Sequence, residues 1–273
     1  MKKKFTLLLL FMIGAISAQT RGVIKDSLTG KPVPFVSIWS ENENIGTTSE
    51  ENGSFAIGTT QKSKTLIFHS LGFEKKKLAI ANTAVVLLSP KVNALDEVVV
   101  RKRKETKRRE IGIIESAVLE AFENQPKIDL KFFPYQSDYK QTGFIKKIGL
   151  ITDSRIDDAT IKIHIYSVDA NGFPGAELLD RDLVVTVGKG NRQSVFDVSK
   201  FNLALPKTGV FIGFEKIMIE KNKREDRNSY YPYVLYNWVA RNRSFAYLGG
   251  QWTAQSAEKK NIYEPAITLV LTN

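Results

Sequence analysis

Residues Ser89–Glu110 read SPKVNALDEVVVRKRKETKRRE and separate two parts of the chain. Their second half, Arg101–Arg109, contains seven basic residues and one acidic residue, with nothing apolar among them. A run of like charge without an apolar face is typical of a solvated connector. We therefore predict that residues 90–130 are a linker carrying this basic cluster, between folded units at 19–89 and 131–273.

Composition supports two folded units and restricts their chemistry. The chain has 273 residues, of which 42% are hydrophobic and 25% are charged, as in globular proteins. The net charge is +11, but removing Lys2, Lys3, Lys4 and the +6 of Arg101–Arg109 leaves only +2. No broad basic face is implied, so we expect no nucleic-acid partner. The absence of cysteine excludes disulfides and thiolate chemistry.

The first 18 residues have the pattern of an export signal. Lys2–Lys4 are followed by the apolar run Leu7–Ile13 and by the small residues of Ala15–Ala18. The apolar run is far shorter than the roughly 20 residues that span a membrane. We predict a signal peptide at 1–18 and an exported protein, with an uncleaved anchor as the alternative.

Residues 19–89 have the turn chemistry of a small β-sandwich. Thr29-Gly30 and Asn52-Gly53 are turn signals between short strand-like runs. The segments GVIKDSLTGKPVPFVSIW (22–39), IGTTSEENGSFAI (45–57) and LIFHSLGFEKKKLAI (66–80) resemble the carboxypeptidase regulatory-like domain. That resemblance implies a seven-stranded, transthyretin-like sandwich without chemistry of its own.

The same resemblance implies a location and a partner. Such domains stand ahead of TonB-dependent transporters and in other envelope proteins of Gram-negative bacteria. The segment LDEVVV at Leu95–Val100 resembles the one that leads into a transporter plug. Too few residues follow for a plug and a large barrel. We therefore expect a periplasmic, outer-membrane-associated or cell-surface protein, and an accessory of such machinery rather than a transporter.

Residues 131–273 show strand patterns with almost no helical periodicity. Ile161, Ile163 and Ile165 alternate with Lys162, His164 and Tyr166, which predicts a half-buried strand. About eight such strands predict a jelly-roll-like sandwich. The segments IKIHIYSVDANGFPGAELL (161–179), VFDVSKFNLALPKTGVFIGFE (195–215) and GGQW (249–252) resemble galactose-binding-like and carbohydrate-binding modules. Residues 111–124 fit either a short helix or a strand, and we favour the helix.

No pattern in the chain predicts a catalytic centre. His69 and His164 are the only histidines, and each stands alone within a strand pattern. We therefore predict no enzyme and no cofactor, and an enzyme of unknown class ranks third among the functions. Asp169 and Asn171 could supply oxygen ligands to calcium, but the same residues form ordinary β-turns.

The strongest binding signal is the aromatic and polar stretch Tyr230–Trp252. Sugar rings stack on flat aromatic faces, while guanidinium groups and amides bind their hydroxyls. The alternative is that these rings belong to the core. The residues we predict as ligand contacts are Tyr236, Trp238, Arg241, Tyr247 and Trp252.

The basic cluster admits three interpretations, which are a plain spacer, a contact with anionic lipid head groups, and a contact with nucleic acid. Export favours the first two. Its residues are Arg101, Lys102, Arg103, Lys104, Lys107, Arg108 and Arg109. We predict an exported, non-enzymatic envelope protein that binds carbohydrate or a surface partner. The alternative function is a scaffold for outer-membrane machinery, with Leu95–Val100 as a docking strand.

Overall fold

The computed structural model describes residues 19–91, 104–112, 114, 118–120, 127–225, 229–240, 243–254 and 261–273. The predicted signal peptide at 1–18 lies outside these residues. The described part of the chain has no helix that could span a bilayer. Its helical turns are short 3-10 segments, and the predicted all-β class is confirmed. These segments are η1 (Ile80–Asn82), η2 (Ser137–Gln141), η3 (Ser199–Phe201) and η4 (Glu220–Asn222).

Residues 19–91, the first unit, form a sandwich of seven strands in two sheets, as predicted. One sheet has the order β4-β1-β7, and the other has the order β3-β2-β5-β6. Apolar side chains that alternate along the strands, such as Ile24, Ile38 and Phe68, meet between the sheets. The strands are β1 (Gln19–Asp26), β2 (Ser37–Ser40), β3 (Gly46–Thr48), β4 (Ser54–Gly58), β5 (Thr65–His69), β6 (Lys76–Ala79) and β7 (Val85–Leu88).

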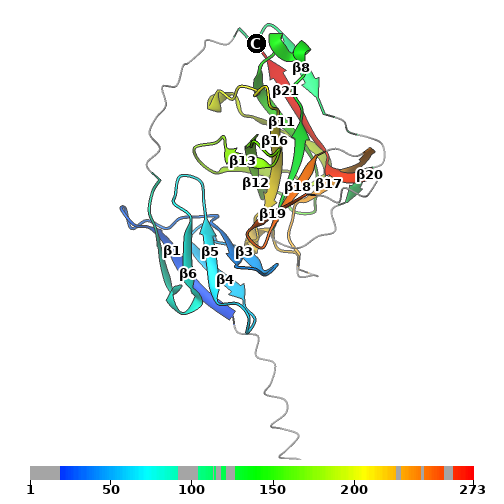
Figure 1. Ribbon diagram of the computed structural model, residues 1–273. Coiled ribbons are helices and arrows are strands. Elements are labelled where there is room, and N and C mark those ends of the chain that lie inside the picture. The colour runs from blue at the N-terminus through cyan, green and yellow to red at the C-terminus, as the bar shows by residue number, and fades with distance from the viewer. Residues whose placement is uncertain are drawn as a thin grey trace, which may run out of the picture.

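The second unit, residues 104–273, is a larger sandwich of two seven-stranded sheets (Figure 1). In the first sheet, the order is β13-β12-β16-β10-β18-β19, and β14 pairs with β12. These strands are β10 (Ile128–Phe133), β12 (Ala159–Val168), β13 (Pro174–Glu177), β14 (Leu183–Val187), β16 (Val210–Lys216), β18 (Ser244–Leu248) and β19 (Gln251–Ala254).

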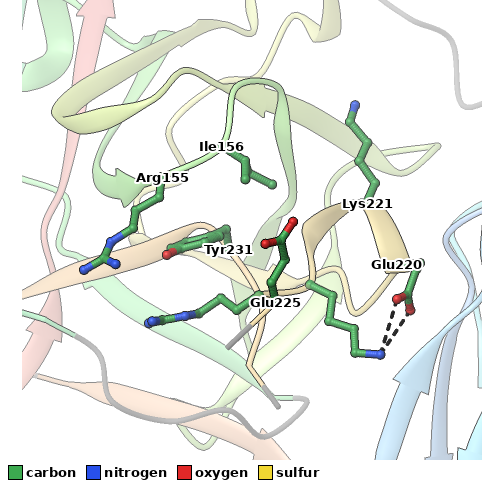
Figure 2. Close-up of a pocket in the computed structure, with 8 residues that line it drawn as sticks. Arg155, Ile156, Glu220, Lys221, Glu225 and Tyr231 are labelled. Atoms are coloured by element: carbon green, nitrogen blue, oxygen red, sulfur yellow. Dashed lines mark hydrogen bonds and ion pairs between the residues drawn. The ribbon is translucent and has the colours of Figure 1, made fainter. Parts of the chain in front are cut away.

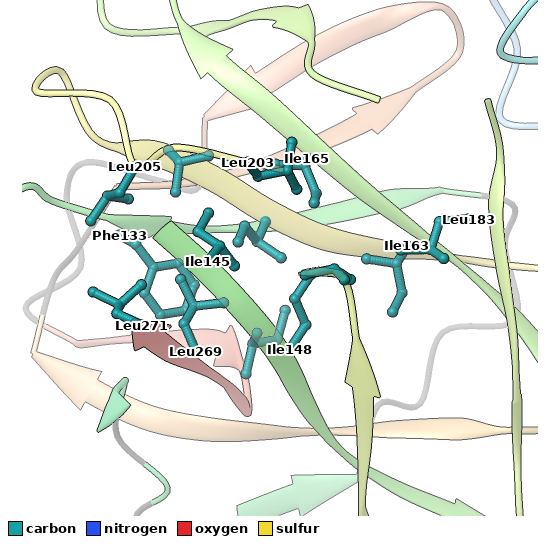
Figure 3. Packing of buried hydrophobic residues seen from close by; sticks show 14 of the residues in the cluster. Phe133, Ile145, Ile148, Ile163, Ile165, Leu183, Leu203, Leu205, Leu269 and Leu271 are labelled. Carbon is teal, nitrogen blue, oxygen red and sulfur yellow. The ribbon is translucent and has the colours of Figure 1, made fainter. Parts of the chain in front are cut away.

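The other sheet of the second unit has the order β20-β17-β11-β21-β8, with β15 on β11 and β9 on β17. Ile148 and Leu269 of this sheet meet Ile163 and Ile165 of the first sheet in a core of branched side chains (Figure 3). These strands are β8 (Arg108–Ile111), β9 (Val118–Glu120), β11 (Phe144–Ser154), β15 (Gly190–Asp197), β17 (Tyr233–Ala240), β20 (Asn261–Pro265) and β21 (Ile267–Thr272).

The region expected to be a linker contains strands of the second unit. β8 pairs with β21, and β9 pairs with β17 in the stretch where a short helix was favoured. The helix is therefore wrong for Val118–Glu120, because the open edge of β17 supplies main-chain partners that a local periodicity does not reveal. β10 begins at Ile128, ahead of the expected boundary at 131.

The half-buried strand predicted for 161–166 is buried on both faces. Its isoleucines enter the core as expected, but Lys162 and His164 are each 1% exposed. The first unit covers this polar face, with Phe35 and Ser37 in contact with Lys162. The two units therefore share an interface, which the expectation of a solvated tether between separate bodies did not include.

Candidate binding sites

The interface between the units contains a buried group of charges centred on Lys162 of β12. The Lys162 ammonium donates hydrogen bonds to the Phe35 carbonyl oxygen at 2.8 Å and to Ser37 Oγ at 3.2 Å. It lies 3.4 Å from Asp182 Oδ2 and 3.8 Å from Glu215 Oε2. Phe35 adopts a positive φ of 56°, a conformation that is strained for a bulky residue, and its carbonyl oxygen accepts from this ammonium.

His164 lies on the same face and bridges two carboxylates. Its Nδ1 is 2.6 Å from Glu177 Oε1, and its Nε2 is 3.0 Å from Glu215 Oε2. Burial alone would lower the pKa of His164, but the two carboxylates outweigh it and raise that pKa to about 9. Burial would raise the pKa of Glu215, but Lys162 and His164 lower it to about 2. Both groups are therefore charged at neutral pH.

Two further segments of the first unit complete the interface. Asp182 accepts hydrogen bonds from Ser70 Oγ at 2.7 Å and from the Leu71 main-chain N–H at 3.3 Å. The Met218 N–H donates to Thr48 Oγ1 at 3.1 Å. The segment at Phe35–Ser37, the end of β3 at Thr48 and the loop at Ser70–Leu71 of the first unit thus each contact the second unit.

An aromatic cluster lies beside the charges, where Trp39 of β2 packs into the second unit. The ring centroids of Trp39 and Tyr247 are 5.4 Å apart, and those of Tyr247 and Trp252 are 5.0 Å apart. Tyr166 meets Trp252 at 5.2 Å, and all three pairs are edge-to-face. These rings enclose the interface cavity, a space of about 140 Å³ lined by Trp39, His69, Lys75, Ile128, Tyr166, Tyr247 and Trp252.

The five aromatic-region residues predicted as ligand contacts do not form one site. Tyr236 is 7% exposed and donates a hydrogen bond to Asp129 inside the second unit, so it is a core residue. Tyr247 and Trp252 line the interface cavity. Trp238 lies on β17 and is partly exposed. Arg241 lies outside the described residues.

Trp238 forms an exposed ring pair with Tyr263. The two residues face each other across β17 and β20, with ring centroids 4.3 Å apart and an angle of 49° between the planes. Trp238 is 37% exposed and Tyr263 is 44% exposed. This pair therefore presents aromatic surface to solvent, unlike the rings of the interface cavity.

A larger groove of about 730 Å³ lies between the β11–β12 turn and the loop after β16 (Figure 2). Arg155 and Tyr231 lie on one side of this groove, and Lys221 and Glu220 lie on the other. Glu220 pairs with Lys223 at 3.3 Å. The lining residues are Arg155, Ile156, Glu220, Lys221, Lys223, Arg224, Glu225 and Tyr231, with four basic and two acidic side chains. The groove therefore carries an excess of positive charge.

The proposed calcium residues form a tight loop. Asp169 Oδ1 accepts hydrogen bonds from the main-chain N–H groups of Asn171 at 2.9 Å and Phe173 at 2.8 Å. Gly172 follows with a φ of +82°, as a turn requires. Among the described residues, no group of three or more acidic or histidine side chains could hold a metal. The loop has the hydrogen bonds of a β-turn, and calcium binding by Asp169 and Asn171 stays a prediction.

The described basic residues of the cluster are held along the second unit. Lys107 donates to Gln141, Arg109 pairs with Asp138, and Arg108 lies 3.8 Å from Glu110. Lys104 is exposed. Arg101, Lys102 and Arg103 lie outside the described residues, so the lipid contact stays a prediction.

The residues that sequence reasoning missed come from distant parts of the chain. Trp39 was assigned to the first unit alone, and Arg155 and Lys221 stand in turns without a motif. The alternation of Lys162 and His164 with isoleucines was visible, but it carried no sign that another unit covers them.

Comparison with known proteins supports the resemblance seen in the sequence. The family model described as the CarboxypepD_reg-like domain matches residues 20–100. Domains of this family occur in bacterial envelope proteins. The match fits a binding module. No curated protein matches the chain.

Solved structures with similar arrangements are distant. One contains the cysteine protease and lectin-like domains of a surface layer associated protein of Clostridium difficile, at 12% identity and a TM-score of 0.41. The alignment covers 84% of this chain but only 46% of that one. Another is a structure of the Gx strain of infectious bursal disease virus, at 10% identity and a TM-score of 0.29, covering 93% of this chain and 74% of that one.

Proposed function

We propose that this chain is an exported, non-enzymatic protein of the cell envelope whose second unit binds carbohydrate. Export is supported by the signal-like pattern at 1–18, and the envelope by the domain matched at 20–100. The observation that supports carbohydrate as the ligand is the exposed ring pair of Trp238 and Tyr263.

The ring pair suits a sugar because of its exposure and its position on a rigid sheet. A pyranose has an apolar face of C–H groups that stacks on an aromatic ring, and stacking removes both surfaces from water. Trp238 and Tyr263 are held by paired strands, so little side-chain freedom is lost when a ligand binds. Exposure of a Trp ring beside a Tyr ring is unfavourable in water, and a ligand that covers the two rings removes this cost.

A glycan array with the native chain and Trp238→Ala tests this proposal. We expect the native chain to bind a subset of glycans and the variant to bind them at least about tenfold more weakly. Phe173→Ala is the matched control, because Phe173 is an aromatic residue of similar exposure, 41%, in the loop between β12 and β13. A folded native chain that binds no glycan, or equal losses in both variants, would contradict the proposal.

The groove supports a second candidate, an accessory protein that recognises an acidic segment of an envelope partner. Arg155 and Lys221 are exposed, and neither has an ion-pair partner among the described residues. An acidic segment of extended chain would pair with them across the groove. The docking role predicted for Leu95–Val100 falls on residues outside those described and belongs to this candidate.

Charge reversal separates the two candidates. We expect Arg155→Glu with Lys221→Glu to abolish co-purification with an envelope partner while leaving glycan binding intact. Lys31→Glu with Lys189→Glu changes the net charge equally at other exposed positions and is the control. Deletion of Leu95–Val100 is expected to remove partner recruitment only. Partner recovery unchanged in both the double variant and the deletion would exclude the accessory role.

A further inference from the structure

The interface cavity has an unpaired hydrogen-bond donor in its wall. Trp39 is 2% exposed, and its Nε1–H has no acceptor among the described residues. An indole N–H that is buried without an acceptor loses its hydrogen bonds to water and gains none in return, so such a group in a folded protein calls for an explanation. A cavity beside the ring provides room for an acceptor that is not part of the chain.

The size and the walls of the cavity restrict what could fill it. Its volume of about 140 Å³ is close to the roughly 150 Å³ of an engineered protein cavity that takes benzene, so it can enclose no more than one ring of a ligand. The rings of Trp39, Tyr166, Tyr247 and Trp252 provide apolar faces on several sides. Lys75 Nζ donates to Tyr247 OH at 3.1 Å, so a second polar group stands at the cavity.

The charges around the cavity favour a neutral occupant. Lys75, Lys162 and His164 supply three positive charges, and Glu177, Asp182 and Glu215 supply three negative charges. Lys162 and His164 are already paired with carboxylates, and Lys75 is an exposed residue, so an anion in the cavity would find no buried unpaired cation to balance it. A fully apolar ring would leave the Trp39 N–H unpaired.

We propose that the interface cavity binds one neutral sugar ring, with Trp39 Nε1–H donating a hydrogen bond to an oxygen of that sugar. The aromatic walls stack against the C–H faces of the ring, and the Lys75–Tyr247 pair offers a second polar contact. Because both units line the cavity, the bound sugar also holds them together. This site and the Trp238–Tyr263 surface are proposed for the same class of ligand but share no residue. An experiment can therefore contradict one proposal without contradicting the other.

The chain has three tryptophans, and the indole N–H signal of Trp39 reports directly on this site. Each gives one indole N–H signal in a ¹⁵N NMR spectrum, and single Trp→Phe variants assign them. The native chain is titrated with neutral monosaccharides and with their methyl glycosides, which separate a free sugar from the end of a glycan chain. We expect a saturable shift of the Trp39 signal, with Trp252 following it. A shift of the Trp238 signal alone would report the exposed ring pair of the proposed function and would count against this site.

Two variants and a defined set of outcomes complete the experiment. Trp39→Phe is expected to weaken binding at least about tenfold, as reported by the Trp252 signal, provided that thermal melting shows a folded chain. Trp238→Phe should leave the titration of the Trp39 signal unchanged, although it replaces the indole of the proposed glycan surface with a smaller ring. A Trp39 signal that no neutral sugar shifts at millimolar concentration, or that only acidic sugars shift, would overturn the inference and leave ordered water as the occupant.

Discussion

Lys162 shows how much a single side chain depends on partners contributed by distant segments. Its ammonium is buried between Asp182, Glu215 and the carbonyl of Phe35. Removing one member of a buried ion pair leaves the other charge unpaired, which costs about 3–5 kcal/mol. We expect Lys162→Met to lower the free energy of unfolding by that amount, measured by urea denaturation.

An exposed ion pair provides the control for this prediction. Lys77 lies 2.5 Å from Glu41, but its side chain is 56% exposed. Water screens such a pair, so Lys77→Met should change stability by less than about 1 kcal/mol. Similar effects of the two substitutions would mean that Lys162 is solvated in solution.

At this scale the sequence predicted which side chains share a face but not what covers that face. Ile161, Ile163 and Ile165 were correctly placed in the core because period-2 alternation is a local property. The burial of Lys162 depends on residues more than a hundred positions away. For the same reason, Tyr236 and Trp238 looked equivalent as ligand contacts although one is buried and the other exposed.

Among the strand pairs, β10 and β16 approach each other so closely that only glycine fits at position 213. A Cβ at Gly213 would lie 1.8 Å from the main-chain oxygen of Asp129. That oxygen belongs to the neighbouring strand and cannot move away without separating the pair. We expect Gly213→Ala to destabilise the protein by about 3 kcal/mol or more, measured as a lower urea midpoint.

The matched control is Gly143→Ala, where an added Cβ would meet no heavy atom within 4 Å. Its effect should stay within about 0.5 kcal/mol. If Gly213→Ala is as stable as this control, β10 and β16 are not in the close register described here.

Strands with strong alternation were predictable from sequence, whereas short edge strands were not. β12 and β21 bury branched side chains in a regular pattern that decides their structure locally. β8 consists of Arg108–Ile111, whose basic residues indicated solvent, and it forms because the edge of β21 accepts it. The strand at Val118–Glu120 likewise depends on β17.

Across the whole molecule, the interface charges make stability depend on pH. His164 of β12 faces Glu177 of β13 and Glu215 of β16, with Lys162, Asp182, Tyr166 and His69 nearby. Its pKa is raised from 6.5 to about 9, so its contribution to stability is complete below pH 6.5 and is lost as pH rises through 9. We expect the free energy of unfolding to fall by about 3 kcal/mol over that window.

Acid acts through other groups of the same interface. The pKa of Glu215 is lowered to about 2, so its contribution is present above pH 4.5 and is lost as pH falls toward 2. Burial lowers the pKa of His69, so this residue destabilises the fold as pH falls below 6.5. Urea unfolding at a series of pH values measures both the acid and the alkaline loss of stability. His164→Gln should abolish the alkaline loss and His69→Gln should not, whereas a native chain with constant stability from pH 6.5 to 9 would refute the assignment.

The basic run Arg101–Arg109 made a division into two parts visible in the sequence, although residues 104–109 of that run belong to the second unit. The contact between the parts is not visible, because its residues are single polar or aromatic side chains scattered from Phe35 to Trp252. Each of them has an ordinary local explanation as a turn, a strand or a solvent-facing position. Only the folded chain brings them together.

The interface also has a mechanical consequence. Among the described residues, all strand pairings stay within one unit, and each hydrogen bond between the units uses at least one side chain. We therefore expect a pulling force applied through the two ends of the chain to separate the units before it unfolds either sandwich. A protein built this way lengthens in a first step at low tension, relaxes when the tension ends, and keeps both of its sandwiches folded.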